Sequence, residues 1–124
     1  MRVPILTRSG YVIAAIQSPP SDDDLVQLGD ELARQVAAEH ARGVIVDVTA
    51  LDVMDSFTVR TLRRICDGIR LCGAETVIVG VQPDVAFALH QLGLTLHPVA
   101  TAPDLAGGIE QLGRLARADR RDVQ

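Results

Sequence analysis

One serine stands among three aspartates where a strand-like run gives way to a helix-like run. The stretch DVTALDVMDSFT begins at Asp47, contains Asp52, and places Asp55 directly before Ser56. A phosphate on a serine at a helix N-terminus meets free backbone N–H groups and the positive end of the helix dipole, although neighbouring carboxylates partly cancel that gain. Position alone favours simple capping of the helix by Asp55 or Ser56, which is compatible with a phosphoacceptor role.

Arginines dominate the outer face of the helix predicted after Ser56. All 12 Lys+Arg residues of the chain are arginine. Arg60 lies four residues after Ser56, so the two side chains share a helix face and Arg60 could pair with a phosphate there. The face is either solvated or a docking surface for an acidic partner. Its arginines, accompanied by Asp67, are Arg60, Arg63, Arg64 and Arg70.

Other residues that could do chemistry carry weaker patterns. Thr58 is a second hydroxyl, but its place in the first helical turn favours packing or capping over phosphorylation. The three aspartates could form a magnesium-binding cluster, but receiver-type phosphorylation also needs a lysine, which the chain lacks. The histidines have no metal-ligand spacing and no nucleotide-binding glycine motif is present, so we predict no metal and no cofactor. The histidines are His40, His90 and His97.

Alternating strand-like and helix-like runs must position these residues. Ser9-Gly10 is a turn pair suited to a tight hairpin, and the β-branched run after Gly43 is typical of a strand covered on both faces. We expect Gly43 to close the first helix as a left-handed cap. Gly107-Gly108 is expected to be either a close-packing point or a weak point of the last helix, and not a phosphate cradle. The predicted strands are 3–7, 11–16, 43–48, 76–81 and, weakly, 94–99. The predicted helices begin at Ser21, Asp55-Ser56, Gln82 and Thr101.

This order predicts an α/β fold with a mixed, mostly parallel sheet of four to five strands and about four helices. The 124 residues suit one domain, 1–124, with a charged tail at 117–124 that frays. The net charge of −4 and the scarcity of aromatic residues argue against nucleic acid as a partner. No apolar run reaches the length of a membrane span, and no signal peptide is evident. Cys66 and Cys72 are expected to be reduced thiols of a cytoplasmic protein.

The stretch from Asp47 to Phe57 resembles the signature of STAS domains, the fold of anti-sigma factor antagonists. The similarity is greater to one subgroup, the RsbS-type stressosome scaffolds, and it extends in order along nearly the whole chain. The residues that carry it are Pro4-Ile5-Leu6, Ile13-Ala-Ala-Ile16-Gln17, Met54-Asp55-Ser56-Phe57, Gly73-Ala74, Gly80-Val81-Gln82-Pro83 and Leu92-Gly93-Leu94.

The resemblance implies a non-catalytic regulator with Ser56 as the phosphoacceptor. The unphosphorylated protein would sequester an RsbT-type serine kinase of the GHKL ATPase class, within an assembly built with RsbR-type STAS co-scaffolds, and phosphorylation would release the kinase. A phosphatase is a further expected partner, and the protein would form homo- or hetero-oligomers. The phosphosite environment would comprise Asp47, Asp52, Asp55 and Arg60. The partner surface would comprise Met54, Asp55, Phe57, Arg60, Arg63, Arg64 and Gln82.

Two alternatives remain open from the sequence. One is a simple anti-sigma factor antagonist that binds an anti-sigma kinase one to one. The other is a small flavodoxin-like enzyme or ligand-binding module, which would need a pocket with convergent polar groups.

Overall fold

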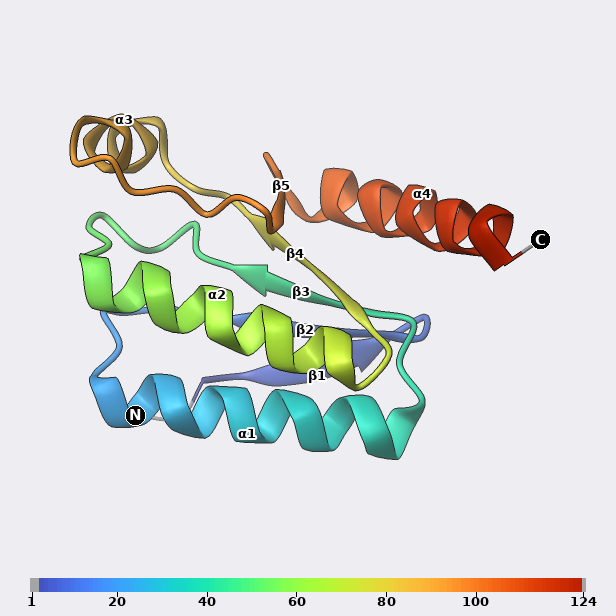
Figure 1. Cartoon of the computed structure of the whole chain (residues 1–124). Helices are drawn as coiled ribbons and strands as arrows, with labels where there is room; N and C mark the ends of the chain where they lie inside the picture. Colours follow the sequence, from blue (N-terminus) through green and yellow to red (C-terminus); the bar gives the residue numbers. More distant parts are fainter. Residues whose placement is uncertain (1–2, 124) are drawn as a thin grey trace.

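A five-stranded sheet in the order β1-β2-β3-β4-β5 runs through the molecule (Figure 1). The computed structural model describes the backbone of residues 3–123 and the side chains of residues 3–117. The strands are β1 Ile5–Arg8, β2 Tyr11–Ala15, β3 Gly43–Asp47, β4 Glu75–Val79 and β5 Ala100–Ala102. The helices are α1 Asp22–Glu39, α2 Ser56–Leu71, α3 Pro83–Gln91 and α4 Leu105–Val123. The predicted α/β class, with a mixed sheet and four helices, is confirmed.

The chain enters the sheet through the predicted hairpin. β1 and β2 pair antiparallel with Arg8 opposite Tyr11, while β2, β3, β4 and β5 pair parallel. Ser9 (φ 55°) and Gly10 (φ 83°) both adopt positive φ. Two such residues make the tight turn whose twist matches that of the flanking strands.

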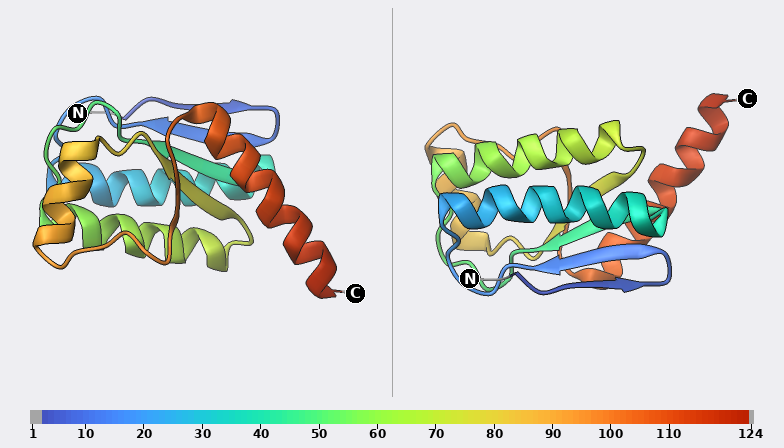
Figure 2. Two further views of the ribbon diagram at one scale, coloured as in Figure 1. Left: turned by 90° about the horizontal axis from the view of Figure 1, so that it is seen from above. Right: turned by 90° about the horizontal axis from the view of Figure 1, so that it is seen from below.

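Helices cover the two faces of the sheet unequally. α1 and α2 lie side by side on one face, and α4 crosses the opposite face (Figure 2). β3 is covered on both sides, as its β-branched run predicts: Val44 and Val46 belong to the core beneath α1 and α2, and Ile45 belongs to the core beneath α4. All three are fully buried.

The prediction that Gly43 closes the first helix is wrong. α1 ends at Glu39, and His40 adopts the left-handed conformation after it (φ 48°, ψ 48°). Gly43 instead opens β3, where a Cβ would lie 2.8 Å from Leu112 Cδ2 of α4. The absent side chain therefore makes room for the helix on the opposite face of the sheet.

The predicted strand at 94–99 is also wrong. Those residues form an irregular segment with a cis peptide bond between His97 and Pro98, and β5 begins only at Ala100. Proline cannot donate to a strand ladder, and the backbone N–H of His97 donates instead to Thr95 Oγ1 at 3.0 Å. Leu96, only 8% exposed, contributes to the core without belonging to a strand.

α4 begins later than predicted and packs closely on the sheet. Thr101 lies in β5, and Asp104 Oδ1 accepts a hydrogen bond from the N–H of Gly107 at 2.8 Å, which satisfies a donor of the first turn. A Cβ on Gly108 would lie 2.7 Å from Val79 Cγ1, so of the two alternatives for Gly107-Gly108 the structure supports close packing, at Gly108. The α4 backbone continues to Val123. The predicted fraying of 117–124 falls largely outside the described side chains and stays a prediction.

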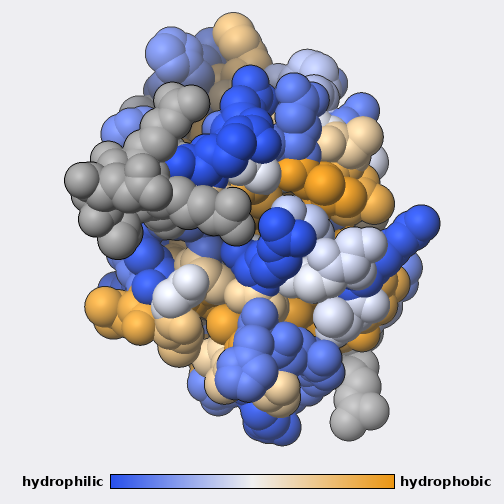
Figure 3. Space-filling view, turned by 90° about the vertical axis from the view of Figure 1, so that its right-hand side faces the viewer, coloured by the Kyte–Doolittle hydropathy of each residue, from blue (hydrophilic) through white to orange (hydrophobic). Residues whose placement is uncertain are grey.

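Figure 3 views the end of the molecule at which β2, β3 and β4 begin. Hydrophilic residues there are interspersed with smaller hydrophobic patches. Within residues 3–123, none of the helices combines the length and the apolar character needed to cross a lipid bilayer.

Candidate functional site

The stretch that carries Ser56 lies at the end of the sheet where the parallel strands finish. Asp47 is the last residue of β3, and the chain then loops over 48–55 before α2 begins at Ser56. The turn from β4 into α3, residues 80–82, lies at the same end (Figure 1). Loops at the carboxyl ends of parallel strands commonly carry the functional groups of α/β folds.

Asp47 shapes the start of the loop. Its Oδ1 accepts hydrogen bonds from the backbone N–H of Thr49 at 2.9 Å and from Thr49 Oγ1 at 2.6 Å. This is an Asx turn, in which a short side chain fixes the backbone two residues further on. Asp47 therefore fixes the conformation of the loop. Among the described residues, no hydrogen bond joins Asp47 to Ser56.

The β4–α3 turn contacts the loop 48–55 and fixes its position. Gln82 Nε2 donates to the carbonyl oxygen of Thr49 at 2.7 Å and to Asp52 Oδ1 at 3.4 Å. Gly80 (φ +80°) packs directly against Thr49, and a Cβ at this glycine would run into the Thr49 hydroxyl. Sequence reasoning placed the turn near the same sheet end but missed the Gln82–Thr49 bond, because the partners are 33 residues apart.

Asp55, and not Ser56, caps α2. Its backbone is extended (φ −85°, ψ 174°), and its Oδ1 accepts from the N–H of Thr58 at 2.7 Å. The hydrogen bond from the Thr58 backbone, followed by one from the Thr58 side chain, lowers the pKa of Asp55 below its ordinary value, and the charge of Arg60 lowers it further. Of the two capping alternatives left open by the sequence, the structure selects Asp55, which stays ionised at neutral pH.

Ser56 is the first residue of α2, and its side chain is partly exposed. Arg60 Nη2 donates to Ser56 Oγ at 3.3 Å from one turn further along the helix. The predicted pairing of these two residues is therefore already present with the unmodified hydroxyl. A phosphate in place of that hydroxyl would strengthen it, because charge-assisted hydrogen bonds are shorter and stronger than neutral ones.

Thr58 and Met54 lie inside the molecule. Thr58 is 7% exposed, so its hydroxyl is poorly placed to meet a kinase, and it packs and bonds locally as the sequence favoured. Met54 is 6% exposed and belongs to the main core. The placement of Met54 on the partner surface is wrong for the described structure, because its side chain anchors the loop from beneath.

The surface around Ser56 combines apolar and basic side chains. Phe57 is 38% exposed and Val53 is 74% exposed. Arg60 and Arg64 are exposed on α2, whereas Arg63 is half-buried. Val53 was missed by sequence reasoning, because a single aliphatic residue in a loop does not show which way it faces.

No group of three or more histidine, cysteine, aspartate or glutamate side chains within the described residues is arranged to hold a metal ion. The three aspartates of the predicted site take separate roles. Asp47 bonds to Thr49, Asp52 to Gln82, and Asp55 to Thr58.

Comparison with known proteins shows similarity to STAS domain proteins at the level of both sequence and structure. The family model described as STAS domain matches residues 7–106. A serine-to-glutamate variant of RsbS from Moorella thermoacetica is 36% identical, with a TM-score of 0.78 and coverage of 94% of this chain and 99% of that one. A chain from a structure described as the molecular architecture of the stressosome, a signal integration and transduction hub, is 36% identical, with a TM-score of 0.76 and coverage of 92% and 99%.

Similarity also extends to a curated protein of Bacillus subtilis, the RsbT co-antagonist protein RsbRA. The match is 28% identical over 94 residues, which is 76% of this chain and 34% of that protein. The chain therefore spans about a third of the length of this curated relative.

Proposed function

This chain belongs to the STAS domain family, and we propose that it is a non-catalytic scaffold of a stressosome-type partner-switching system, with Ser56 as its phosphoacceptor. The observation that carries the proposal is the geometry of Ser56. Ser56 is partly exposed on the first turn of α2, and Arg60 Nη2 lies 3.3 Å from its Oγ. The loop that precedes Ser56 is fixed by the hydrogen bond from Gln82 to the carbonyl oxygen of Thr49. The similarity to RsbS over almost the full length of both chains supports the same role.

The switch is a local change of charge. A phosphate adds about −1.5 to −2 charges. Asp55 already occupies the N–H of Thr58, so a phosphate on Ser56 relies on the remaining N–H groups of the first turn and on Arg60. In a close interface with a kinase the same phosphate would have to be desolvated, which is costly without a matched partner. Phosphorylation therefore favours release of the kinase without refolding of the domain.

The partner in the unphosphorylated state is an RsbT-type serine kinase of the GHKL class. It would contact exposed Val53 and Phe57 beside the arginines of α2, so its complementary surface would be acidic with an apolar centre. RsbR-type STAS proteins would be the co-scaffolds, and a phosphatase would restore the unmodified state. This cycle would take place in the cytoplasm. A simple anti-sigma factor antagonist would use the same serine, but full-length similarity to RsbS favours the scaffold.

Intact-mass analysis tests the phosphoacceptor directly. The protein is incubated with ATP and an RsbT-type kinase, alongside Ser56→Ala and, as a matched hydroxyl control, Thr58→Val. We expect one added phosphate, about 80 Da, in the wild type and in Thr58→Val, and none in Ser56→Ala. A full mass gain in Ser56→Ala would overturn the assignment of Ser56. No gain in any variant, with a kinase shown to be active on another STAS protein, would overturn the switch.

A further inference from the structure

β1 leaves one edge of the sheet open (Figure 1). It pairs only with β2, and at its start the backbone N–H of Ala15 donates to the carbonyl oxygen of Pro4 at 3.2 Å. Because the bonded residues of an antiparallel pair alternate, Ile5 and Thr7 direct their N–H and C=O groups away from β2. Among residues 3–123, no hydrogen bond engages these four groups. They are a template for one further strand.

A groove of about 730 Å³ lies beside this edge, between β1 and α1. Its strand side is apolar, because Ile5 pairs with Ala14 and turns its side chain to the face of the sheet that α1 covers. Buried Leu28 lines the groove from α1. Since side chains alternate between the two faces of a sheet, a strand added to β1 would direct every second side chain toward this groove.

The helix side of the groove is acidic. Asp24, Asp30 and Glu31 line it, together with a single arginine, Arg34. α1 runs along β1 (Figure 2), and Asp24 lies about 10.5 Å from Glu31 along the helix axis. Residues four apart on an extended strand are separated by about 13 Å and point to the same face. Two basic side chains at that spacing would therefore reach both carboxylates, with an apolar side chain over Leu28 between them.

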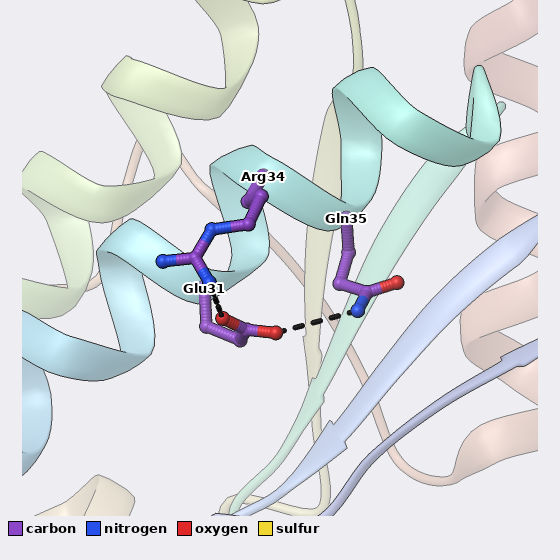
Figure 4. Close-up of polar contacts among 3 residues, drawn as sticks. All are labelled: Glu31, Arg34 and Gln35. Carbon is purple, nitrogen blue, oxygen red and sulfur yellow. Dashed lines mark hydrogen bonds and ion pairs between the residues drawn. The ribbon is translucent and has the colours of Figure 1, made fainter.

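Glu31 is positioned by its neighbours on α1. Figure 4 shows Arg34 Nη1 3.0 Å from one carboxylate oxygen of Glu31 and Gln35 Nε2 3.3 Å from the other. A carboxylate has about four acceptor positions, so Glu31 can accept a further donor. The side chain of Arg34 is 71% exposed, and an exposed pair of this kind contributes little. Arg34 can therefore move aside for a basic side chain while Gln35 keeps Glu31 in place.

We propose that the open edge of β1 binds an extended, basic segment of a partner protein, which adds to the sheet as a sixth strand. The backbone of Ile5 and Thr7 supplies hydrogen bonds whatever the sequence of the segment. The groove selects segments in which two basic residues flank an apolar one at alternate positions. This surface uses β1 and α1 and leaves the loop 48–55 and the arginines of α2 free, so the segment can bind whether or not a kinase is bound.

Charge disfavours a second copy of the chain at this edge. Two β1 strands paired about a two-fold axis would place both α1 helices on one face of the joined sheet. α1 carries six acidic residues and one arginine, so acids would line the joined groove from both sides. Like charges across an interface are unfavourable. A basic segment meets the same acids with the opposite charge.

A synthetic peptide, Ser-Lys-Thr-Val-Thr-Lys-Ser with both ends blocked, tests the proposal without kinase or phosphorylation, so its outcome is independent of the proposed function. The control peptide has glutamate in place of each lysine. Isothermal titration calorimetry with the whole protein covers peptide concentrations up to about 1 mM. We expect the lysine peptide to bind at least about tenfold more tightly than the glutamate peptide, and to bind more weakly as salt screens the exposed charges. Equal affinities, or no binding of the lysine peptide, would overturn the proposal.

Amide hydrogen exchange locates the bound peptide. The N–H groups of Ile5 and Thr7 should exchange at least about threefold more slowly with the lysine peptide bound. Those of Leu6 and Arg8, which bond to β2, should stay unchanged. Slowing confined to α2 or α4 would place the peptide elsewhere and overturn the proposal. Slowing at Ile5 and Thr7 that rises with protein concentration in the absence of peptide would assign the edge to a second copy, which also overturns it.

Two variants separate the contribution of charge from that of backbone pairing. Glu31→Lys reverses a charge in the groove. Its matched control is Glu39→Lys, because Glu39 is exposed on the same helix and does not line the groove. Thr7→Pro removes an outward N–H and leaves the bonds to β2 intact. Circular dichroism verifies folding, and if Thr7→Pro does not fold, Glu31→Lys decides alone.

We expect Glu31→Lys and Thr7→Pro each to weaken binding of the lysine peptide at least about fivefold, and Glu39→Lys to stay within about twofold of the wild type. The proposal would be overturned if Glu31→Lys bound the lysine peptide as tightly as the wild type. It would be overturned equally if Glu39→Lys weakened binding as much as Glu31→Lys, because the attraction would then come from the overall charge of α1 and not from the groove.

Discussion

The side chain of Gln82 donates a hydrogen bond of 2.7 Å to the backbone carbonyl of Thr49. The bond joins the turn after β4 to the loop after β3, and the backbone of Gly80 packs on the same threonine. The loop that leads to Ser56 is therefore fixed by its own Asx turn and by the neighbouring strand. A kinase would meet a preformed surface at this site, which limits the ordering cost of binding.

Replacing Gln82 tests the role of this bond. Gln82→Glu removes the donor but keeps the shape, and Gln82→Ala removes both. Each should lower the free energy of unfolding by about 0.5–1.5 kcal/mol. Amide hydrogen exchange should accelerate in residues 48–55 and stay unchanged in β1 and β2. Equal acceleration throughout the sheet would show that Gln82 acts on global stability and not on the loop.

Gly80→Ala should be more damaging than either Gln82 variant. The position combines positive φ, which costs an L-residue about 1–2 kcal/mol, with direct contact against the Thr49 side chain. Urea unfolding would measure the loss. Gly93→Ala is a matched control, because Gly93 has φ +70° but nothing within 4 Å of its added Cβ. If Gly80→Ala and Gly93→Ala lower the free energy of unfolding equally, the contact with Thr49 contributes nothing to stability.

Asp55→Ala should lower the stability of the domain by about 0.5–2 kcal/mol at neutral pH, because it removes the N-cap of α2. The folded pKa of Asp55 lies below its ordinary value of 3.8. The ionised cap therefore stabilises the fold above that ordinary value, and the contribution is lost as pH falls through the folded pKa. The stability difference between wild type and Asp55→Ala should accordingly narrow in acid. Asp55→Asn, which caps without a charge, should lose little at neutral pH.

Ser56→Ala should fold with a stability within about 0.5 kcal/mol of the wild type, because Ser56 does not cap α2 and its bond to Arg60 is exposed. The variant should bind the kinase and keep it when ATP is added. Wild-type protein should release the kinase under the same conditions. Release from Ser56→Ala after ATP addition, measured by size-exclusion chromatography, would contradict the proposed switch.

The two cysteines should differ in reactivity. Burial raises the pKa of the Cys66 thiol to about 11, whereas Cys72 is exposed at the end of α2. A thiol reagent at about pH 8 should therefore modify one cysteine quickly in the native protein and both in denaturant. Cys72→Ser should abolish the fast phase. Persistence of the fast phase in that variant would show that the core around Cys66 opens readily.

Much of the fold follows from local patterns. The hairpin is encoded by two adjacent residues that tolerate positive φ, and the central strand is encoded by a continuous β-branched run. The position of Ser56 was also predictable, because it follows a loop after a buried strand and precedes an amphipathic helix. Its pairing with Arg60 required only helical spacing.

The errors arose where tertiary contacts overrule local preference. Gly43 resembles a helix terminator, but the packing of Leu112 against it explains why it is glycine. Leu96 lies in an apolar run typical of a strand, yet it fills the core from irregular backbone. Met54 belongs to the loop that carries the site, and no local pattern indicates that it points inward. Neither the bond between Gln82 and Thr49 nor the groove between β1 and α1 could be predicted without the packed structure.

The order of strands in the sheet also bears on how the chain forms during synthesis. Each strand pairs with the strand that precedes it in the chain, so every new strand can be added to an edge that already exists. No strand is inserted between two strands that have already paired. Each pairing therefore closes only the chain segment between consecutive strands, and the entropy cost of loop closure stays low. α4 follows all five strands in the chain and covers Ile45 and Val79 on the bare face. Until it docks, the nascent domain presents an uncovered apolar sheet, and that interval is when a chaperone would be needed most.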